Sequence, residues 1–130
     1  MRGESVVREE QGQAMTEFAV VLPVFALLLF AILQFGIAFN NYLTLTDAVR
    51  RGARVAAVSR QSGSGTSDTI AAVKQSASDL DKSKLGISVS TTWEPGTDVT
   101  VEATYPYKIN VLGIVVAAGN LKSKTTERVE

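Results

Sequence analysis

An uninterrupted apolar stretch dominates the N-terminal third of the chain. No acidic or basic side chain occurs between Glu17 and Asp47, and Gln34 is the only strongly polar residue among the 22 residues 18–39. As an α-helix this stretch would be about 33 Å long at ~1.5 Å per residue, which is enough to cross a hydrocarbon core of about 30 Å. A helix of a soluble domain would show a polar face within one turn. The pattern therefore predicts a membrane-spanning helix.

Residues 40–58 continue the helical period with an amphipathic pattern. Apolar or small residues recur three and four positions apart, at Leu45, Ala48, Val49, Gly52 and Ala56. The small residues of this stripe, Ala48, Gly52 and Ala56, would let another backbone approach closely. Two interpretations stay open: the stripe lies on the protein's own sheet, or it packs against the helix of another subunit.

A short second helix is predicted after a Ser/Gly-rich loop at residues 59–67. Ser67 or Asp68 is expected to cap this helix, and Gly86 is expected to end the segment. The expected apolar face consists of Ile70, Val73, Ala77 and Leu80.

The remaining chain changes to a period of two, which predicts a small antiparallel sheet. Residues 87–93 alternate as a strand, residues 94–98 form a turn with Pro and Gly, and residues 99–105 return. We expect Trp93 and Tyr105 to pack across this hairpin, and we expect Pro106 to end the strand pairing.

The C-terminal third contains an apolar core at residues 111–118, too short to span a bilayer. It could be a buried loop or strand, or an exposed patch that partners cover. Residues 121–129 are long enough for a third strand. The predicted fold class is α+β, with a long N-terminal helix, a short second helix and an antiparallel sheet of about three strands.

Composition narrows the possible chemistry. Thirteen basic residues balance thirteen acidic ones, so no bulk charge favours nucleic acid. The chain has no cysteine and no histidine, which removes disulfides, thiolate chemistry and the commonest general base and metal ligand. We therefore expect no enzyme activity, no catalytic or metal-binding residue and no cofactor.

Three identities compete for the apolar stretch. A secretory signal peptide would have a shorter apolar region, although "GIA" at residues 36–38 loosely fits a cleavage site after Ala38. An ordinary signal anchor explains the length but not the flanking sequence "GQAMTEF" at residues 12–18. In that sequence Gly12 precedes Glu17 by five positions, at the start of the apolar helix.

This third feature resembles the processing site of type IV prepilins, which has a glycine, four residues and a glutamate before a long apolar helix. Together with "LTDAVRRGARVAAV" at residues 45–58, it is similar to the TadE-like family of minor pilins or pseudopilins. The resemblance implies cleavage between Gly12 and Gln13 and removal of residues 1–12 as a leader, expected to be a charged, solvated tail. It also implies a role for Glu17 and Phe18 in assembly.

The implied organisation is a leader at residues 1–12, a transmembrane helix at 13–39, its amphipathic continuation at 40–58 and a small pilin-like module at 59–130. The resemblance implies a single-pass protein of the bacterial inner membrane with its N-terminus in the cytoplasm. It also implies later incorporation into an extracellular pilus used in adhesion or secretion, where the helix would pack to initiate or cap the filament. Implied partners are a prepilin peptidase, major and other minor pilins, an assembly platform with its ATPase, and membrane lipid.

Basic residues do not support this orientation. Arg2 and Arg8 precede the span, whereas Arg50, Arg51 and Arg54 follow it. The alternative function is a permanently anchored single-pass protein whose module binds a ligand or a surface.

Overall fold

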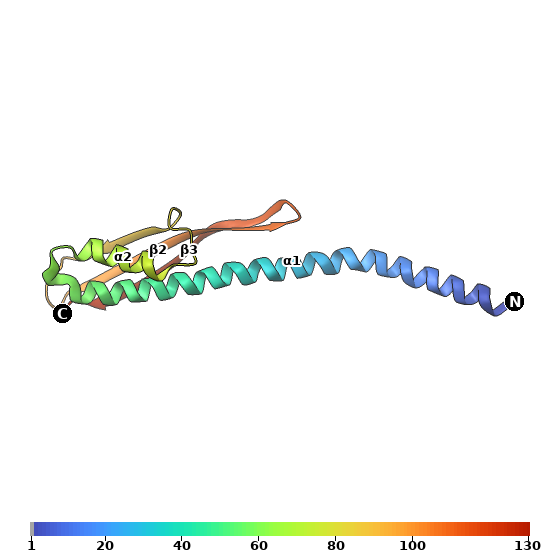
Figure 1. Ribbon diagram of the computed structural model, residues 1–130, viewed down its shortest axis with the longest axis horizontal. Coiled ribbons are helices and arrows are strands. Elements are labelled where there is room, and N and C mark those ends of the chain that lie inside the picture. The colour runs from blue at the N-terminus through green and yellow to red at the C-terminus, as the bar shows by residue number, and fades with distance from the viewer. Residues whose placement is uncertain (1) are drawn as a thin grey trace.

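The computed structural model describes the backbone of residues 2–130 and the side chains from Glu10 onward. Met1, the first residue of the predicted leader, lies outside the described residues. A short helix and a three-stranded sheet lie against the C-terminal end of one long helix (Figure 1). The elements are α1 (Arg2–Val58), the 3-10 helix η1 (Ser59–Ser62), α2 (Gly65–Ser76), β1 (Gly86–Ser90), β2 (Asp98–Val111) and β3 (Ile114–Arg128). The predicted α+β fold class is confirmed.

The long helix α1 is continuous from Arg2 and includes Pro23 in its interior. A proline removes one backbone hydrogen bond, which a long helix can lose without ending. The sequence predicts a solvated tail for the leader, whereas residues 2–12 form part of the helix. This difference has a physical reason. Glu, Arg and Gln have high helix propensity, and extending an existing helix avoids the cost of nucleation.

The connection from α1 to α2 is shorter than the Ser/Gly pattern predicts. Residues Ser59–Ser62 form η1, and α2 begins at Gly65 instead of after Ser67 or Asp68. The N–H of Asp68 donates to the Ser64 carbonyl at 2.9 Å, and the Ser64 hydroxyl donates to the Asp68 carboxylate at 2.7 Å. The predicted capping residues therefore lie in the first turn of the helix. α2 ends at Ser76, and Gly86 begins β1 instead of ending the helix.

The sheet has the order β1-β2-β3 with antiparallel pairing throughout, as predicted. β1 ends at Ser90, so Trp93 lies outside the strand, where its φ of 57° is incompatible with strand geometry. The predicted cross-strand contact between Trp93 and Tyr105 is therefore wrong, because the strand ends three residues before Trp93. The predicted turn at 94–98 is present: the Thr97 N–H donates to the Glu94 carbonyl at 3.1 Å.

The prediction that Pro106 ends the pairing is wrong. β2 continues through Pro106, opposite Asn120, to Val111, and the chain then turns directly into β3. Pairing between β1 and β2 ends at Thr104. Beyond that point β2 has one neighbour only, so a residue without an N–H is tolerated on its open side.

The hydrophobic core lies between the C-terminal half of α1, α2 and the sheet. Its fully buried side chains from α1 are Leu45, Ala48, Val49, Ala53 and Ala56. The rest of the module contributes Val73 of α2, Ala77 just after it, Val99, Val101 and Ala103 of β2, and Val129 just after β3. Burial of each Val or Leu stabilises the fold by about 1.5–3 kcal/mol. The predicted amphipathic stripe of α1 is thus a core-facing stripe within the chain.

Gly52 marks the closest approach of α1 to α2. A Cβ atom added at Gly52 would overlap the Cγ2 atom of Val73, and it would lie 3.6 Å from the Thr69 carbonyl oxygen. Gly36, on the same helix, has nothing within 4 Å of an added Cβ. The two glycines therefore offer a matched pair for testing this packing.

We predict that Gly52→Ala lowers the free energy of unfolding, because overpacking costs about 1–3 kcal/mol and the gain in helix propensity recovers only about 1 kcal/mol. Gly36→Ala should leave stability equal or higher. The measurement is urea unfolding of the detergent-solubilised chain, followed by the emission of Trp93, its single tryptophan. Equal midpoints for the two variants would contradict the close helix packing.

Candidate functional site

The N-terminal half of α1 is a helix with an exposed apolar surface. The helix from Glu10 is long and apolar enough to cross a membrane, and its most apolar window has a mean hydropathy of 2.6 with 0% of its residues buried. A core helix of a soluble protein would be mostly buried. Side chains such as Phe18, Val20 and Leu33 are 64%, 69% and 63% exposed. This surface therefore has no covering within the described part of the chain.

Polar contacts at the start of this surface link Gly12, Gln13 and Glu17. The Gln13 side-chain amide donates to the Glu17 carboxylate at 3.1 Å, one helical turn away. The Thr16 hydroxyl donates to the Gly12 carbonyl at 2.9 Å. Glu17 forms no ion pair among residues 10–130. Its carboxylate therefore has a neutral, exposed partner in its own chain, beside the exposed ring of Phe18.

The peptide bond between Gly12 and Gln13 lies inside the helix. An added Cβ at Gly12 would have nothing within 4 Å, so no packing in the described structure requires a glycine there. Glycine nevertheless weakens a helix interior by about 0.5–1 kcal/mol relative to alanine. Gly12 is thus a position where the helix unwinds more easily than it would at an alanine.

The predicted helix-packing residues Ala48, Gly52 and Ala56 lie on the opposite half of α1. All three are buried against the chain's own α2 and sheet. Of the two interpretations open from the sequence, packing within the chain describes where these residues lie. The structure does not bring them near Glu17, which lies at the far end of the helix.

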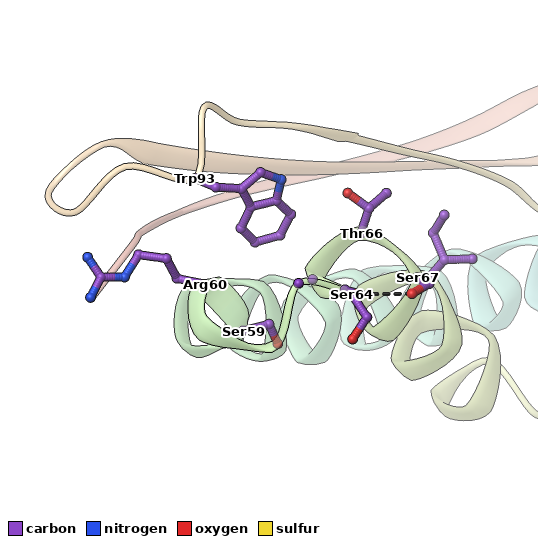
Figure 2. Close-up of a pocket in the computed structure, with 9 residues that line it drawn as sticks. Ser59, Arg60, Ser64, Thr66, Ser67 and Trp93 are labelled. Carbon is purple, nitrogen blue, oxygen red and sulfur yellow. Dashed lines mark hydrogen bonds between the residues drawn. The ribbon is translucent and has the colours of Figure 1, made fainter.

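A shallow cavity at the end of the module far from the apolar helix surface was not predicted. It has a volume of about 520 Å³ and is lined by Arg60, Ser64, Gly65, Thr66 and Trp93, among others (Figure 2). The Trp93 ring packs over Gly65, where an added Cβ would lie 2.6 Å from the ring carbon Cη2. The sequence did not predict this cavity, because neither the place of Gly65 in α2 nor the positive φ of Trp93 follows from a periodic pattern.

The turn after α2 holds the carboxylate of Asp81. The Ser83 hydroxyl and N–H donate to it at 2.6 and 3.0 Å, and the Lys84 ammonium lies 3.8 Å away. These hydrogen bonds, and then the Lys84 charge, lower the pKa of Asp81. The Asp81 N–H donates to the Tyr105 hydroxyl at 3.3 Å. The Asp81 side chain is exposed, so these bonds serve as a local contact between the turn after α2 and β2.

The described residues contain no group of three or more acidic, histidine or cysteine side chains arranged to hold a metal ion. The polar clusters they do contain, at Ser64–Asp68 and Asp81–Ser83, are helix-start and turn contacts.

A second exposed apolar surface lies at the turn between β2 and β3. Leu112 and Ile114 are 72% and 71% exposed. Of the sequence alternatives for residues 111–118, the structure shows a hairpin with an exposed patch. The sequence signal for this patch is that residues 109–121 include no acidic or basic residue and are apolar except for Gly and Asn.

Comparison with known families bears on the helix. Residues 12–54 match the family model described as TadE-like protein. The match begins at Gly12, includes Glu17 and the exposed apolar surface, and ends within α1. The resemblance predicted from the sequence is confirmed for these residues. No curated protein and no solved structure matches the chain.

We predict that Gly65→Ala displaces the Trp93 ring, because the added methyl group occupies the position of the ring edge. The emission maximum of Trp93 should shift to longer wavelength, and the free energy of unfolding should fall by about 1–3 kcal/mol. Thr66→Ala, at the exposed neighbouring position, is the control and should change neither. Unaltered emission in Gly65→Ala would show that the ring does not pack on this glycine.

Proposed function

We propose, from the TadE-like match over residues 12–54, that this protein is a structural, non-enzymatic minor pilin or pseudopilin of a Tad-type (tight adherence) pilus or related secretion system. Its helix α1 anchors it in the bacterial inner membrane before assembly and packs into a filament afterwards. The observation that carries the proposal is the position of Glu17. This carboxylate stands at the entrance of an exposed apolar helix, at a fixed distance from a glycine.

The first step is removal of residues 1–12 by a membrane-embedded prepilin peptidase. Cleavage between Gly12 and Gln13 makes Glu17 the fifth residue of the mature chain. The helical state of residues 2–12 means that the peptidase must unwind the helix locally, and Gly12 lowers the cost of doing so. Cleavage also creates a positively charged amine on Gln13.

The second step is pairing of Glu17 with a positive charge from a neighbouring subunit. A carboxylate in the middle of a bilayer costs on the order of 2–3 kcal/mol, and less near the interface. The Gln13 side chain already donates to Glu17, but an amide brings no charge. The N-terminal amine of an adjacent pilin supplies both the charge and the hydrogen bonds, which favours helix packing over dispersal in lipid.

The amine of Gln13 in the same chain is the competing partner, because residues four apart lie on the same side of a helix. The first residue of a helix has a free backbone amine that points along the axis. Assembly requires that Glu17 pairs with the neighbour's amine in preference to the amine of its own chain. Processing and incorporation into filaments are therefore measured separately below.

The structure bears on membrane orientation through the three basic residues after the span. Arg50, Arg51 and Arg54 are exposed on the part of α1 that packs against the folded module. Charges carried on a translocated domain affect topology less than charges in short loops. We therefore propose that the N-terminus faces the cytoplasm and the module lies outside.

The chain is longer than the short major pilins of Tad systems, so initiation or tip-capping fits it better than forming the shaft. The proposed partners are the prepilin peptidase, the major and other minor pilins, and an assembly platform driven by an ATPase. Adhesion or secretion would be functions of the whole filament.

We predict that Gly12→Ala blocks processing without changing the fold, because no described side chain approaches this position. In cells that carry the cognate peptidase, mass spectrometry should find the wild-type chain starting at Gln13 and the variant starting at its original N-terminus. Gly36→Ala serves as the control and should be processed normally. A wild-type chain that keeps residues 1–12, or is cut after Ala38, would contradict the proposal.

We predict that Glu17→Gln and Glu17→Val are processed normally but enter filaments poorly. Loss of about 2–3 kcal/mol of pairing corresponds to a loss of assembly on the order of 30- to 150-fold. The measurement is the ratio of the subunit in sheared filaments to that in the membrane fraction. Thr16→Ser, one residue away with its hydroxyl retained, is the control. Normal incorporation of both Glu17 variants would exclude the pairing role.

A further inference from the structure

The hairpin at the end of β2 and β3 extends past the rest of the sheet, alongside α1 and toward its N-terminal half (Figure 1). Its turn side chains are apolar and exposed, at 72%, 71%, 53% and 64% for Leu112, Ile114, Val115 and Val116. Exposed apolar clusters of this kind mark interaction surfaces. This cluster has no contact with the core of its own module.

The conformation of the turn adds an independent observation. Leu112 and Gly113 have φ angles of 51° and 86°, so both central residues of this two-residue turn are left-handed. Asn-Gly is the pair that suits such a turn, because a branched or bulky side chain is unfavourable at positive φ. The backbone of Leu112 is therefore strained, and its exposed apolar side chain offsets none of this cost while it stays in water. Strain of this kind is characteristic of positions at which the side chain has a function.

The residues that line the cleft between the hairpin and α1 show which part of α1 lies beside the hairpin. Phe35, Phe39 and Tyr42 of α1 face Tyr107 and Ile109 of β2 across this cleft. Leu112 lies three residues beyond Ile109, which is about 10 Å of strand or about seven residues of helix. The turn therefore reaches roughly the level of residues 28–30 in α1, which belong to the exposed apolar surface.

This level can be placed in a bilayer. We set the outer edge of the hydrocarbon at Gln34, the only strongly polar residue of the apolar stretch 18–39, so that Phe35 and Phe39 lie in the interface. About 20 residues of helix then bring the inner edge close to Ala14, three residues before Glu17. The turn would then lie about 6–9 Å inside the outer edge, a depth typical of apolar surfaces that rest in a membrane interface. Lys108, about four residues back from the turn, would lie among the headgroups.

We propose that this hairpin is a second membrane contact, which inserts the side chains of Leu112, Ile114 and Val116 into the outer headgroup–acyl boundary of the bilayer that α1 spans. The proposal rests on the membrane-anchored part of the proposed function. Lipid is the favoured partner because α1 holds the turn at the level of the bilayer in every subunit, before any other chain is present.

The insertion is shallow for a physical reason. A two-stranded hairpin has unpaired N–H and C=O groups along its outer edges, and these cannot enter hydrocarbon without a hydrogen-bond partner. The turn side chains can enter while the edges stay in the hydrated interface. The contact would fix how the soluble module stands on the membrane, and the module must give it up when the subunit leaves for a filament.

The test uses the absence of cysteine from the chain. Single substitutions Leu112→Cys, Ile114→Cys, Val24→Cys and Ser90→Cys are labelled with an environment-sensitive fluorophore in the full chain. The protein is reconstituted at low density in phosphatidylethanolamine–phosphatidylglycerol vesicles. Quenching is compared for nitroxides at the top of the acyl chain, at its end and in the aqueous phase.

Labels at 112 and 114 should emit at shorter wavelength than the label at 90 and be quenched most by the nitroxide at the top of the acyl chain. The label at 24 should be quenched most by the nitroxide at the chain end. Aqueous quenching at 112 and 114 with lipid quenching at 24 would overturn the hairpin contact and leave the anchor intact. Aqueous quenching at 24 as well would overturn the anchor itself.

Labels at 112 and 114 that neither the lipid nor the aqueous quencher reaches would overturn the proposal in favour of a protein partner. A second comparison uses a label at Val116 in the Leu112→Asn variant. Asn suits the turn better than Leu, so unfolding cannot explain a change. Lipid quenching should fall in this variant and stay unchanged in Val58→Asn, which removes a similarly exposed apolar side chain at the opposite end of the module. Equal quenching in both would contradict the contact.

Discussion

The structure depends on one constraint: the apolar surface of the N-terminal half of α1 cannot remain in water. Side chains from Phe18 to Phe39 are exposed along several turns, and each Leu or Phe removed from water stabilises a structure by about 1.5–3 kcal/mol. The module at the other end of the helix leaves most of this surface uncovered, and only its β2–β3 hairpin approaches it, across the cleft that Phe35 and Phe39 line. A bilayer, or the helices of other subunits, must therefore cover it, which is the requirement that a membrane anchor and a filament subunit share.

The two halves of α1 meet this requirement differently. In the C-terminal half, small residues such as Gly52 let α2 approach closely, and the helix forms one wall of a core. In the N-terminal half, large apolar residues face outward, with Glu17 at the entrance. The rigid connection between them fixes the height of the module, and therefore the level reached by the hairpin turn at Leu112. A single helix thus determines the position of every surface proposed to touch lipid or a neighbouring subunit.

Much of this arrangement could be predicted from the sequence, because it follows from periodicity. The absence of charge after Glu17, the stripe containing Ala48 and Gly52, and the alternation in the hairpin each correspond to an observed element. The errors occurred where the backbone conformation is set by tertiary contacts. Trp93 leaves the strand because it packs on Gly65, and Pro106 remains in a strand because its neighbour β1 has already ended. The two-residue turn of the hairpin could not be predicted, because its first position holds Leu112, whereas Asn is the residue typical of that position.

The central claim is that Glu17 binds the N-terminal amine of a neighbouring subunit in the assembled filament. The most direct measurement is zero-length carbodiimide cross-linking of filaments assembled from mixed isotopically light and heavy subunits, followed by mass spectrometry. The account predicts an amide bond between the Glu17 carboxyl and the α-amine of a different chain. Cross-links confined to Glu17 and Gln13 of the same chain, or no cross-link at Glu17 in intact filaments, would contradict it.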